Sequence, residues 1–259
     1  MPSTFAPSGP QAPVSRSPYL KTVAAWAALF DPAELPVLDS TVELLAEARE
    51  REDFVDAHSL AQLVCADPLM TLKLLSHVGW LRRGRDGGEP ETVTAALVML
   101  GITPFFKHFG SVHSVEEQLC RHPGAKAGFD AVLDRSHRAS SFATAFAAQR
   151  LDHDVAVISS AALLHDFAEL LLWLSVPAAA SAMRERQLQD STLRSTEVQK
   201  EILGITLPEL QHELMVRWRL PKLLSQIADD AHHNEYAARI IAEKMFDELE
   251  DDLRRISGS

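Results

Sequence analysis

The sequence has few cysteines, glycines and tyrosines, and these low counts exclude some classes of protein and favour others. Its 259 residues include only two cysteines, Cys65 and Cys120, too few for a disulfide framework or a thiolate zinc site. We expect both thiols to be reduced, as is typical of a cytoplasmic protein. There are 11 glycines and 2 tyrosines, while alanine and leucine abound, so the composition favours helix over sheet.

Basic residues are fewer than acidic ones, and this disfavours nucleic acid as a partner. With 25 basic and 36 acidic residues, the formal charge is −11, and such a surface repels phosphate backbones. The N-terminus has no basic start followed by an apolar run, so no secretory signal is indicated. The most apolar stretch, residues 159–183, contains His165, Asp166, Glu169 and Pro177, and this predicts a core segment rather than a membrane span. We expect neither nucleic acid nor a membrane as a partner.

The chain divides into four segments. Residues 1–18 hold five prolines and four serines without apolar periodicity, which predicts a disordered arm. A break at residues 122–124 separates an N-terminal helical subdomain, residues 19–120, from a second helical subdomain, residues 125–235. Residues 236–259 are predicted to form an acidic amphipathic helix, whose apolar side is expected to be buried against the domain or against a second copy. Packing on the domain is favoured, and a homodimer is the alternative.

Apolar periodicity and breakers predict an all-α fold with no β-alternation. Asp67-Pro68 breaks the chain and places Pro68 at the start of a helix. Ser40 or Thr41 is predicted to cap the helix that follows it, with Glu43 completing a capping box. The expected helices lie near residues 23–30, 40–51, 59–66, 69–81, 92–100, 129–151, 155–176, 178–188, 195–203 and 208–218, with another from Pro221.

The strongest chemical signal is the pair His165-Asp166 within the apolar stretch ALLHDFAELLLW. A buried His and Asp require hydrogen bonds, a charge partner or a metal. One interpretation is structural, with the pair fixing the register of neighbouring helices, and on composition alone it is favoured. The other is a metal site, completed by His137, His232 and His233, because imidazole and carboxylate suit Mn, Fe or Zn and can activate water.

Several motifs in order resemble a known family. LAQLVCADPLMTLKLL at 60–75, ETVTAALVMLG at 91–101, LLHDF at 163–167 and EILGITLPELQHELMVRWRLP at 201–221 precede His232-His233. Together they resemble the HD superfamily of metal-dependent phosphohydrolases, and more closely its divergent branch, the HDOD (HD-related output) domain of bacterial signalling proteins, over about residues 35–235. The resemblance implies an HD-like bundle of helices and a role in signal transduction.

The departures from that pattern imply a degenerate metal site. Leu207 stands where active cyclic-di-GMP phosphodiesterases of the superfamily carry a metal-binding His, and Ala168 and Glu169 stand where Gly and Lys follow the His-Asp pair. Gly79-Trp80 replaces the early Asn-Ser pair, and no GYP signature follows the His pair. The residues that remain could hold a single Fe, Mn or Zn ion and are His137, His165, Asp166, His232 and His233. We expect no cofactor and no catalytic residue; in an active protein, the catalytic residues would be His165 and Asp166.

One local basic loop is a candidate ligand site. Its residues are Arg82, Arg83, Arg85 and Asp86, and the spacing Arg83-x-x-Asp86 resembles the site that binds cyclic di-GMP in diguanylate cyclases. A solvated loop is the favoured interpretation. The aromatic residues nearby, Phe105, Phe106 and Phe109 with Trp80 upstream, are expected in the core rather than in a stacking platform, as is Trp218.

The resemblance, together with the departures from it, implies two functions, with a purely structural scaffold as a third possibility. The favoured one is a non-catalytic, regulatory signal-transduction module of a bacterial cytoplasm, which acts by binding a partner protein. The alternative is a metal-dependent phosphohydrolase that cleaves a nucleotide or a cyclic dinucleotide, with His137, His165, Asp166 and His233 as metal ligands. The first hypothesis rests on Leu207 and Glu169 at positions where the chemistry requires a ligand and a cation.

Overall fold

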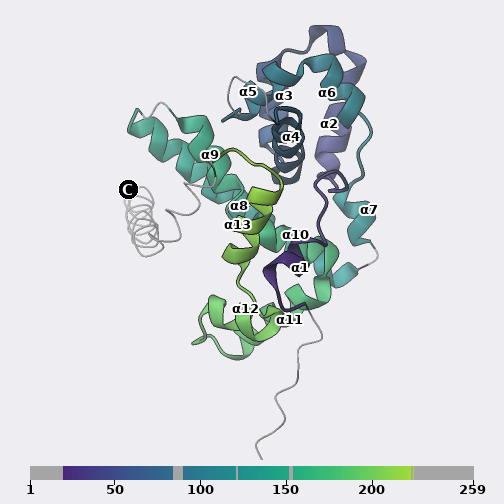
Figure 1. Cartoon of the computed structure of the whole chain (residues 1–259). Helices are drawn as coiled ribbons and strands as arrows, with labels where there is room; N and C mark the ends of the chain where they lie inside the picture. Colours follow the sequence, from purple (N-terminus) through teal and green to yellow (C-terminus); the bar gives the residue numbers. More distant parts are fainter. Residues whose placement is uncertain (1–19, 84–89, 121, 152–153, 223, 225–259) are drawn as a thin grey trace, which may run out of the picture.

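The all-α prediction is confirmed by the computed structural model, which describes residues 20–83, 90–120, 122–151, 154–222 and 224 (Figure 1). Within these ranges there is no strand, only an isolated parallel bridge between Val37 and Ser114. The predicted arm at residues 1–18 and the helix at 236–259 lie outside the described residues. The helices are α1 (Val23–Ala27), α2 (Asp39–Glu50), η1 (Glu52–Phe54), α3 (Ala57–Cys65), α4 (Pro68–Leu81), α5 (Val93–Leu100), α6 (Ile102–Phe109), α7 (Val115–Leu119), α8 (Pro123–Gln149), α9 (Val155–Leu163), α10 (Phe167–Ser175), α11 (Pro177–Gln189), α12 (Ser195–Leu203) and α13 (Leu207–Arg217).

Helix α4 is the centre of the first group of helices. It packs against α3 and α5, and most of its residues are buried. As predicted, Pro68 begins the helix; the residue before it, Asp67, is fully buried and caps it by accepting hydrogen bonds from the N–H groups of Leu69 (2.8 Å) and Met70 (3.1 Å). The other carboxylate oxygen of Asp67 accepts from the N–H of Leu38 at 2.7 Å. One side chain therefore joins the start of α4 to the start of α2.

The predicted capping box at the start of α2 is wrong. The helix begins at Asp39, and neither Ser40 nor Thr41 is its N-cap; the N-cap is Leu38, whose side chain forms no capping hydrogen bond. The distant Asp67 accepts the hydrogen bond from the Leu38 N–H instead, so a tertiary contact takes the place of a local signal.

The second group is built on the longest helix, α8, which packs along α9 and also contacts α10 and α11. Pro123 begins α8, so residues 122–124 start a helix and are not a linker between helices. Phe167 of α10 stacks on Trp218, at the end of α13, with ring centroids 5.9 Å apart, and both rings are buried. The predicted burial of Trp218 is confirmed.

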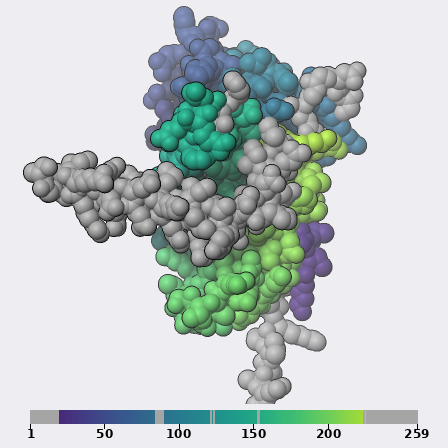
Figure 2. All heavy atoms as spheres, turned by 90° about the vertical axis from the view of Figure 1, so that its left-hand side faces the viewer, coloured from purple at the N-terminus to yellow at the C-terminus, as the bar shows by residue number. Residues whose placement is uncertain are grey.

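The first helix packs on the second group. Helix α1 contacts α13, and the indole N–H of Trp26 donates to the carbonyl oxygens of Leu20 (2.8 Å) and Leu203 (3.1 Å). Both views place α1 beside these later helices and away from the blue α2 and α3 (Figures 1 and 2). Helix α1 therefore belongs to one predicted subdomain by sequence and packs on the other, and the division into two subdomains stays a prediction.

The predicted single helix over residues 155–176 is wrong. It is interrupted at residues 164–166, between α9 and α10, so His165 and Asp166 lie in a turn. Leu164 and Phe167 on either side are fully buried, while His165 is exposed and Asp166 is partly exposed. The break keeps the apolar neighbours in the core while it turns the polar pair outward.

By length and composition, the stretch Val155–Ser175 could cross a membrane. Within the protein, 56% of its most apolar window is buried against other helices. Such burial is typical of a core helix.

Candidate functional site

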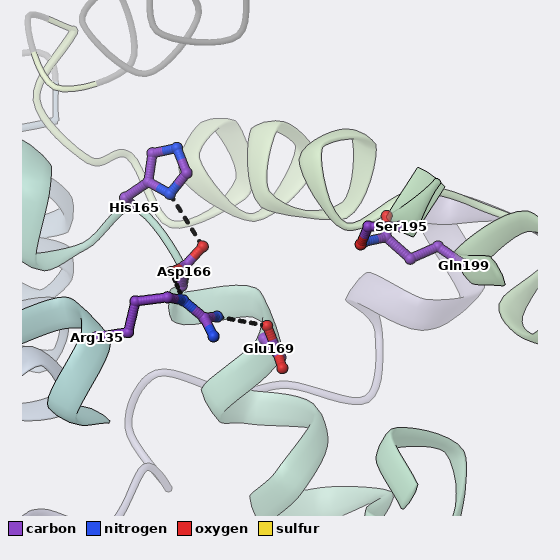
Figure 3. Close-up of polar contacts among 6 residues, drawn as sticks. All are labelled: Arg135, His165, Asp166, Glu169, Ser195 and Gln199. Carbon is purple, nitrogen blue, oxygen red and sulfur yellow. Dashed lines mark hydrogen bonds and ion pairs between the residues drawn. The ribbon is translucent and has the colours of Figure 1, made fainter. Parts of the chain in front are cut away.

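The His-Asp turn faces an arginine that the sequence analysis did not single out. Arg135 of α8 donates from Nε to Oδ2 of Asp166 at 2.6 Å and from Nη2 to Oε2 of Glu169, on α10, at 2.7 Å (Figure 3). The ring nitrogen Nδ1 of His165 lies 2.9 Å from the second oxygen of Asp166. Both oxygens of the Asp166 carboxylate are therefore engaged by side chains of the protein itself.

This arrangement sets the charges of the turn. Partial burial by itself would raise the pKa of Asp166, but the hydrogen bond from His165 and the positive charge of Arg135 outweigh it and bring the pKa to about 2. Burial alone would likewise lower the pKa of Arg135, whereas the carboxylates of Asp166 and Glu169 raise it. The turn holds one guanidinium between two carboxylates, so Glu169 is paired and does not stand as an isolated negative charge.

The described residues do not fit a metal ion at this turn. In that part of the chain, no three His, Cys, Asp or Glu side chains come together in a way that could hold a metal. His137 uses its Nε2 to donate to the carbonyl oxygen of Ala66 at 2.9 Å, which ties α8 to the end of α3. His232 and His233 lie outside the described residues. The structure brings Asp166 together with Arg135, while His137 contacts the first group of helices.

A small cavity of about 220 Å³ adjoins the turn. Arg135 and Glu169 lie on its wall, together with the apolar side chain of Leu207. Gln199 accepts from the N–H of Leu207 at 2.9 Å and donates to Oγ of Ser195 at 2.9 Å, so these polar groups are satisfied internally (Figure 3). On this wall, Arg135 is paired with Glu169, and Gln199 is paired with Ser195 and Leu207, so these groups already have partners within the protein.

The basic loop is only partly described. Arg82 is the C-cap of α4, and Arg83 follows it with its guanidinium carbon 5.9 Å from the ring centre of Trp80. Arg85 and Asp86 lie outside the described residues, so a ligand site at Arg82, Arg83, Arg85 and Asp86 stays a prediction.

The aromatic residues separate into two environments. Phe105, Phe106 and Phe109 are buried and pack edge-on or tilted at 5.2–5.3 Å, which confirms their place in the core. The prediction for Trp80 is wrong: its side chain is 47% exposed. Arg219 covers its ring with the guanidinium carbon 4.8 Å from the centre, so Trp80 is the base of a cation–π contact at the surface.

Sequence reasoning missed Arg135 and Arg219. Arg135 had no local signal, because its partners Asp166 and Glu169 lie 31 and 34 residues later in the sequence. Arg219 had no local signal, because its contact joins the end of α13 to the end of α4, far apart in sequence.

Comparisons with known proteins agree with this fold. The HDOD domain model matches residues 35–235, and no curated protein matches the chain. Two solved structures are similar at low identity. The response regulator MmoQ of Methylococcus capsulatus is 18% identical, with a TM-score of 0.58 over 77% of this chain and 78% of that one. A virulence factor of Campylobacter jejuni is 16% identical, with a TM-score of 0.59 over 80% and 73%. The extent of the family match establishes that the chain belongs to the HDOD family.

Proposed function

We propose that this chain is a non-catalytic regulatory module of bacterial signal transduction, which acts through a protein partner in the cytoplasm and carries a degenerate HD site. The observation that supports the proposal is the guanidinium of Arg135, hydrogen-bonded to Asp166 and Glu169. Metal-assisted hydrolysis requires a carboxylate that is free to bind the metal and a water held at the same ion. Here Arg135 neutralises the carboxylate, and the position of the next ligand is Leu207.

Similarity to other proteins is consistent with a regulatory role. One of the structures that share this fold is described as a response regulator. A module of this kind needs no cofactor, and binding a partner through its surface suffices. A second copy of the chain is a further candidate partner.

The proposal is tested by complementation with a variant that has lost the histidine. A strain deleted for the gene is restored with the wild type, with His165→Ala or with Leu188→Ala. Both side chains are exposed, and the control residue Leu188, on α11, does not line the cavity beside the turn, so we expect all three proteins to fold. A non-catalytic module predicts equal restoration of the regulatory phenotype by all three proteins at matched protein levels.

The alternative, a metal-dependent phosphohydrolase, gives the opposite result. His165→Ala would then fail to restore the phenotype while Leu188→Ala succeeds. Purified wild type would contain about one equivalent of Fe, Mn or Zn and would hydrolyse a nucleotide or cyclic di-GMP, and both properties would be lost in His165→Ala. Elemental mass spectrometry on protein purified without chelator or nickel measures the first property directly.

The partner is sought by crosslinking in living cells with a tagged, functional chain. We expect a defined complex with another signalling protein, which disappears when the regulatory input is removed. A chain that remains an uncrosslinked monomer in cells, and whose deletion changes no regulatory output, would contradict the proposal.

A further inference from the structure

A second cavity in the described part of the chain lies away from the His-Asp turn. It has a volume of about 570 Å³ and is formed where the end of α1 and the loop after it meet α4, the end of α6 and the end of α13. Cavities that hold small molecules have volumes of roughly 300–1,000 Å³. Its size is therefore suited to a small metabolite.

Aromatic and imidazole rings form one part of its wall. His77 and His108 are stacked, with ring centroids 3.8 Å apart and planes inclined by 29°, and Phe109 meets His77 edge-on at 5.3 Å. Burial, and then the neighbouring His108, lower the pKa of His77 to about 4. His77 is thus a neutral, flat ring at physiological pH, and the half-exposed indole of Trp80 also lines the cavity. Such a wall suits a planar ring.

Two polar atoms in the wall lack a partner. Within the described residues, neither Oγ of Ser76 nor Nε1 of Trp218 forms a hydrogen bond, although each residue is only 1% exposed. An unsatisfied buried polar group costs about 1–3 kcal/mol, so folded proteins rarely retain one without a use. Both residues line this cavity, where a ligand with polar edges could satisfy them.

The charges of the wall favour an anion. Lys73 and Arg217 line the cavity, and Arg83 and Arg219 lie over the indole of Trp80. The ammonium of Lys73 donates to two carbonyl oxygens at 2.6 and 2.8 Å, which leaves one of its three N–H groups. Among the described residues that line the cavity, the acidic one is Asp31, which accepts a hydrogen bond from the N–H of Ala33 within its own loop at 2.9 Å.

Trp80, which lines the cavity, is held in a close contact between the end of α4 and the segment after α13. Gly79 lets the carbonyl of Arg219 approach so closely that a Cβ there would lie 2.4 Å from its oxygen. Arg219 itself has a φ of +55°, in the left-handed region that a side chain other than glycine rarely adopts. Backbone strain of this kind concentrates at functional sites. The Gly79-Trp80 pair therefore positions Arg219 over the indole.

We propose that this cavity binds a planar aromatic anion, whose ring packs against the imidazoles of His77 and His108, beside the indole of Trp80, while its negative group is held by Arg217 and Lys73 and its polar edge is hydrogen-bonded by Ser76 and Trp218. A nucleoside monophosphate and an aromatic carboxylate share this chemistry. Such a ligand would be the signal that the regulatory module senses, at a site separate from the His-Asp turn.

The test measures binding of four probes by calorimetry and by quenching of tryptophan fluorescence. GMP and indole-3-carboxylate are the two anions, guanosine is a ring without the charge, and ribose 5-phosphate is a charge without the ring. We expect at least one anion to bind at least tenfold more tightly than guanosine and ribose 5-phosphate. Binding of GMP alone identifies a nucleotide site, and binding of indole-3-carboxylate alone identifies an aromatic-acid site.

Three variants locate the site. Arg217→Gln is expected to weaken binding by at least tenfold, whereas Arg184→Gln, an exposed arginine on the smaller cavity beside Arg135, should leave it within twofold. Ser76→Ala should weaken binding about fivefold without lowering the melting temperature, because it removes an unpaired hydroxyl. The proposal is overturned if neither anion binds at 1 mM, if guanosine binds as tightly as the anions, or if Arg184→Gln weakens binding as much as Arg217→Gln.

Discussion

Replacing Arg135 by glutamine is the most direct test of the charge network at the His-Asp turn. The substitution keeps a polar side chain of similar length and removes the charge that pairs with Asp166 and Glu169. A hydrogen bond to a charged group contributes about 1.5–3 kcal/mol when buried, whereas an exposed ion pair contributes about 0–1 kcal/mol. Because the side chains of Arg135, Asp166 and Glu169 are 46%, 24% and 27% exposed, the network lies between these limits. About 1 kcal/mol for each pair gives a loss of about 2 kcal/mol.

The loss is measured by urea denaturation at pH 7 and by a double-mutant cycle. For a protein of this size, 2 kcal/mol lowers the melting temperature by roughly 4–8 °C. In a cycle with Glu169→Gln, the coupling energy between positions 135 and 169 should be about 1 kcal/mol. A loss below about 0.5 kcal/mol together with zero coupling would refute the reasoning, since the guanidinium would then be solvated rather than engaged.

The same network predicts that the free energy of unfolding depends on pH in the acid range. The pKa of Asp166 is about 2 in the folded protein, below its ordinary value of 3.8. The unfolded chain therefore takes up the proton first, so this stabilisation is present above pH 4 and is lost as the pH falls toward 2. The shift corresponds to at most about 2 kcal/mol, and less after allowance for solvent screening. The fall in unfolding free energy over this interval should be smaller in Arg135→Gln than in the wild type.

Substitutions at Gly128, His77 and Asp67 test the packing, the pH dependence and the helix cap. Gly128→Ala would place a Cβ 2.3 Å from the ring of Trp173 and should lower the melting temperature clearly, whereas Gly124→Ala, one turn earlier with nothing within 4 Å, should leave it unchanged or raise it. Burial and His108 lower the pKa of His77 to about 4, so between pH 6.5 and pH 4 the unfolded chain binds a proton that the folded protein does not. The free energy of unfolding should therefore fall as the pH drops through this interval, and His77→Phe should make that fall smaller. Asp67→Ala removes the acceptor of three backbone N–H groups and should lower the unfolding free energy by about 3 kcal/mol, with Asp67→Asn milder; equal urea midpoints for wild type and Asp67→Ala would contradict the capping role.

Local chemistry was sufficient to predict many helix boundaries. Pro68 begins α4 because its ring fits the first turn, and Gly101 and Gly204 end helices in backbone conformations with φ of +86° and +76° that suit glycine. Each of these signals acts within a few residues of the boundary. The order of the motifs was likewise enough to identify the family.

The sequence could not predict features that depend on contacts between distant segments. Asp166 meets Arg135 from a helix 31 residues earlier, and the cap of Leu38 comes from Asp67, 29 residues later. Helix propensity favoured an unbroken helix through residues 164–166, but burial of Leu164 and Phe167 with exposure of His165 required a turn. A tryptophan in an apolar helix is usually a core residue, and the sequence gives no sign that Arg219 packs on the ring of Trp80 at the surface.

The packing of α1 has a consequence for the order in which the chain acquires structure during synthesis. Trp26 is among the first described residues to leave the ribosome, yet its hydrogen-bond partner Leu203 lies 177 residues later. At roughly 5–20 residues per second, translation of that interval takes roughly 10 to 35 s. Throughout this time the indole of Trp26, which is buried in the finished fold, lacks the later helix α13 that packs against α1. Helix α1 therefore stays without its packing partner until α13 has been made, and a cell that makes this protein must shield the apolar residues of α1 for that time.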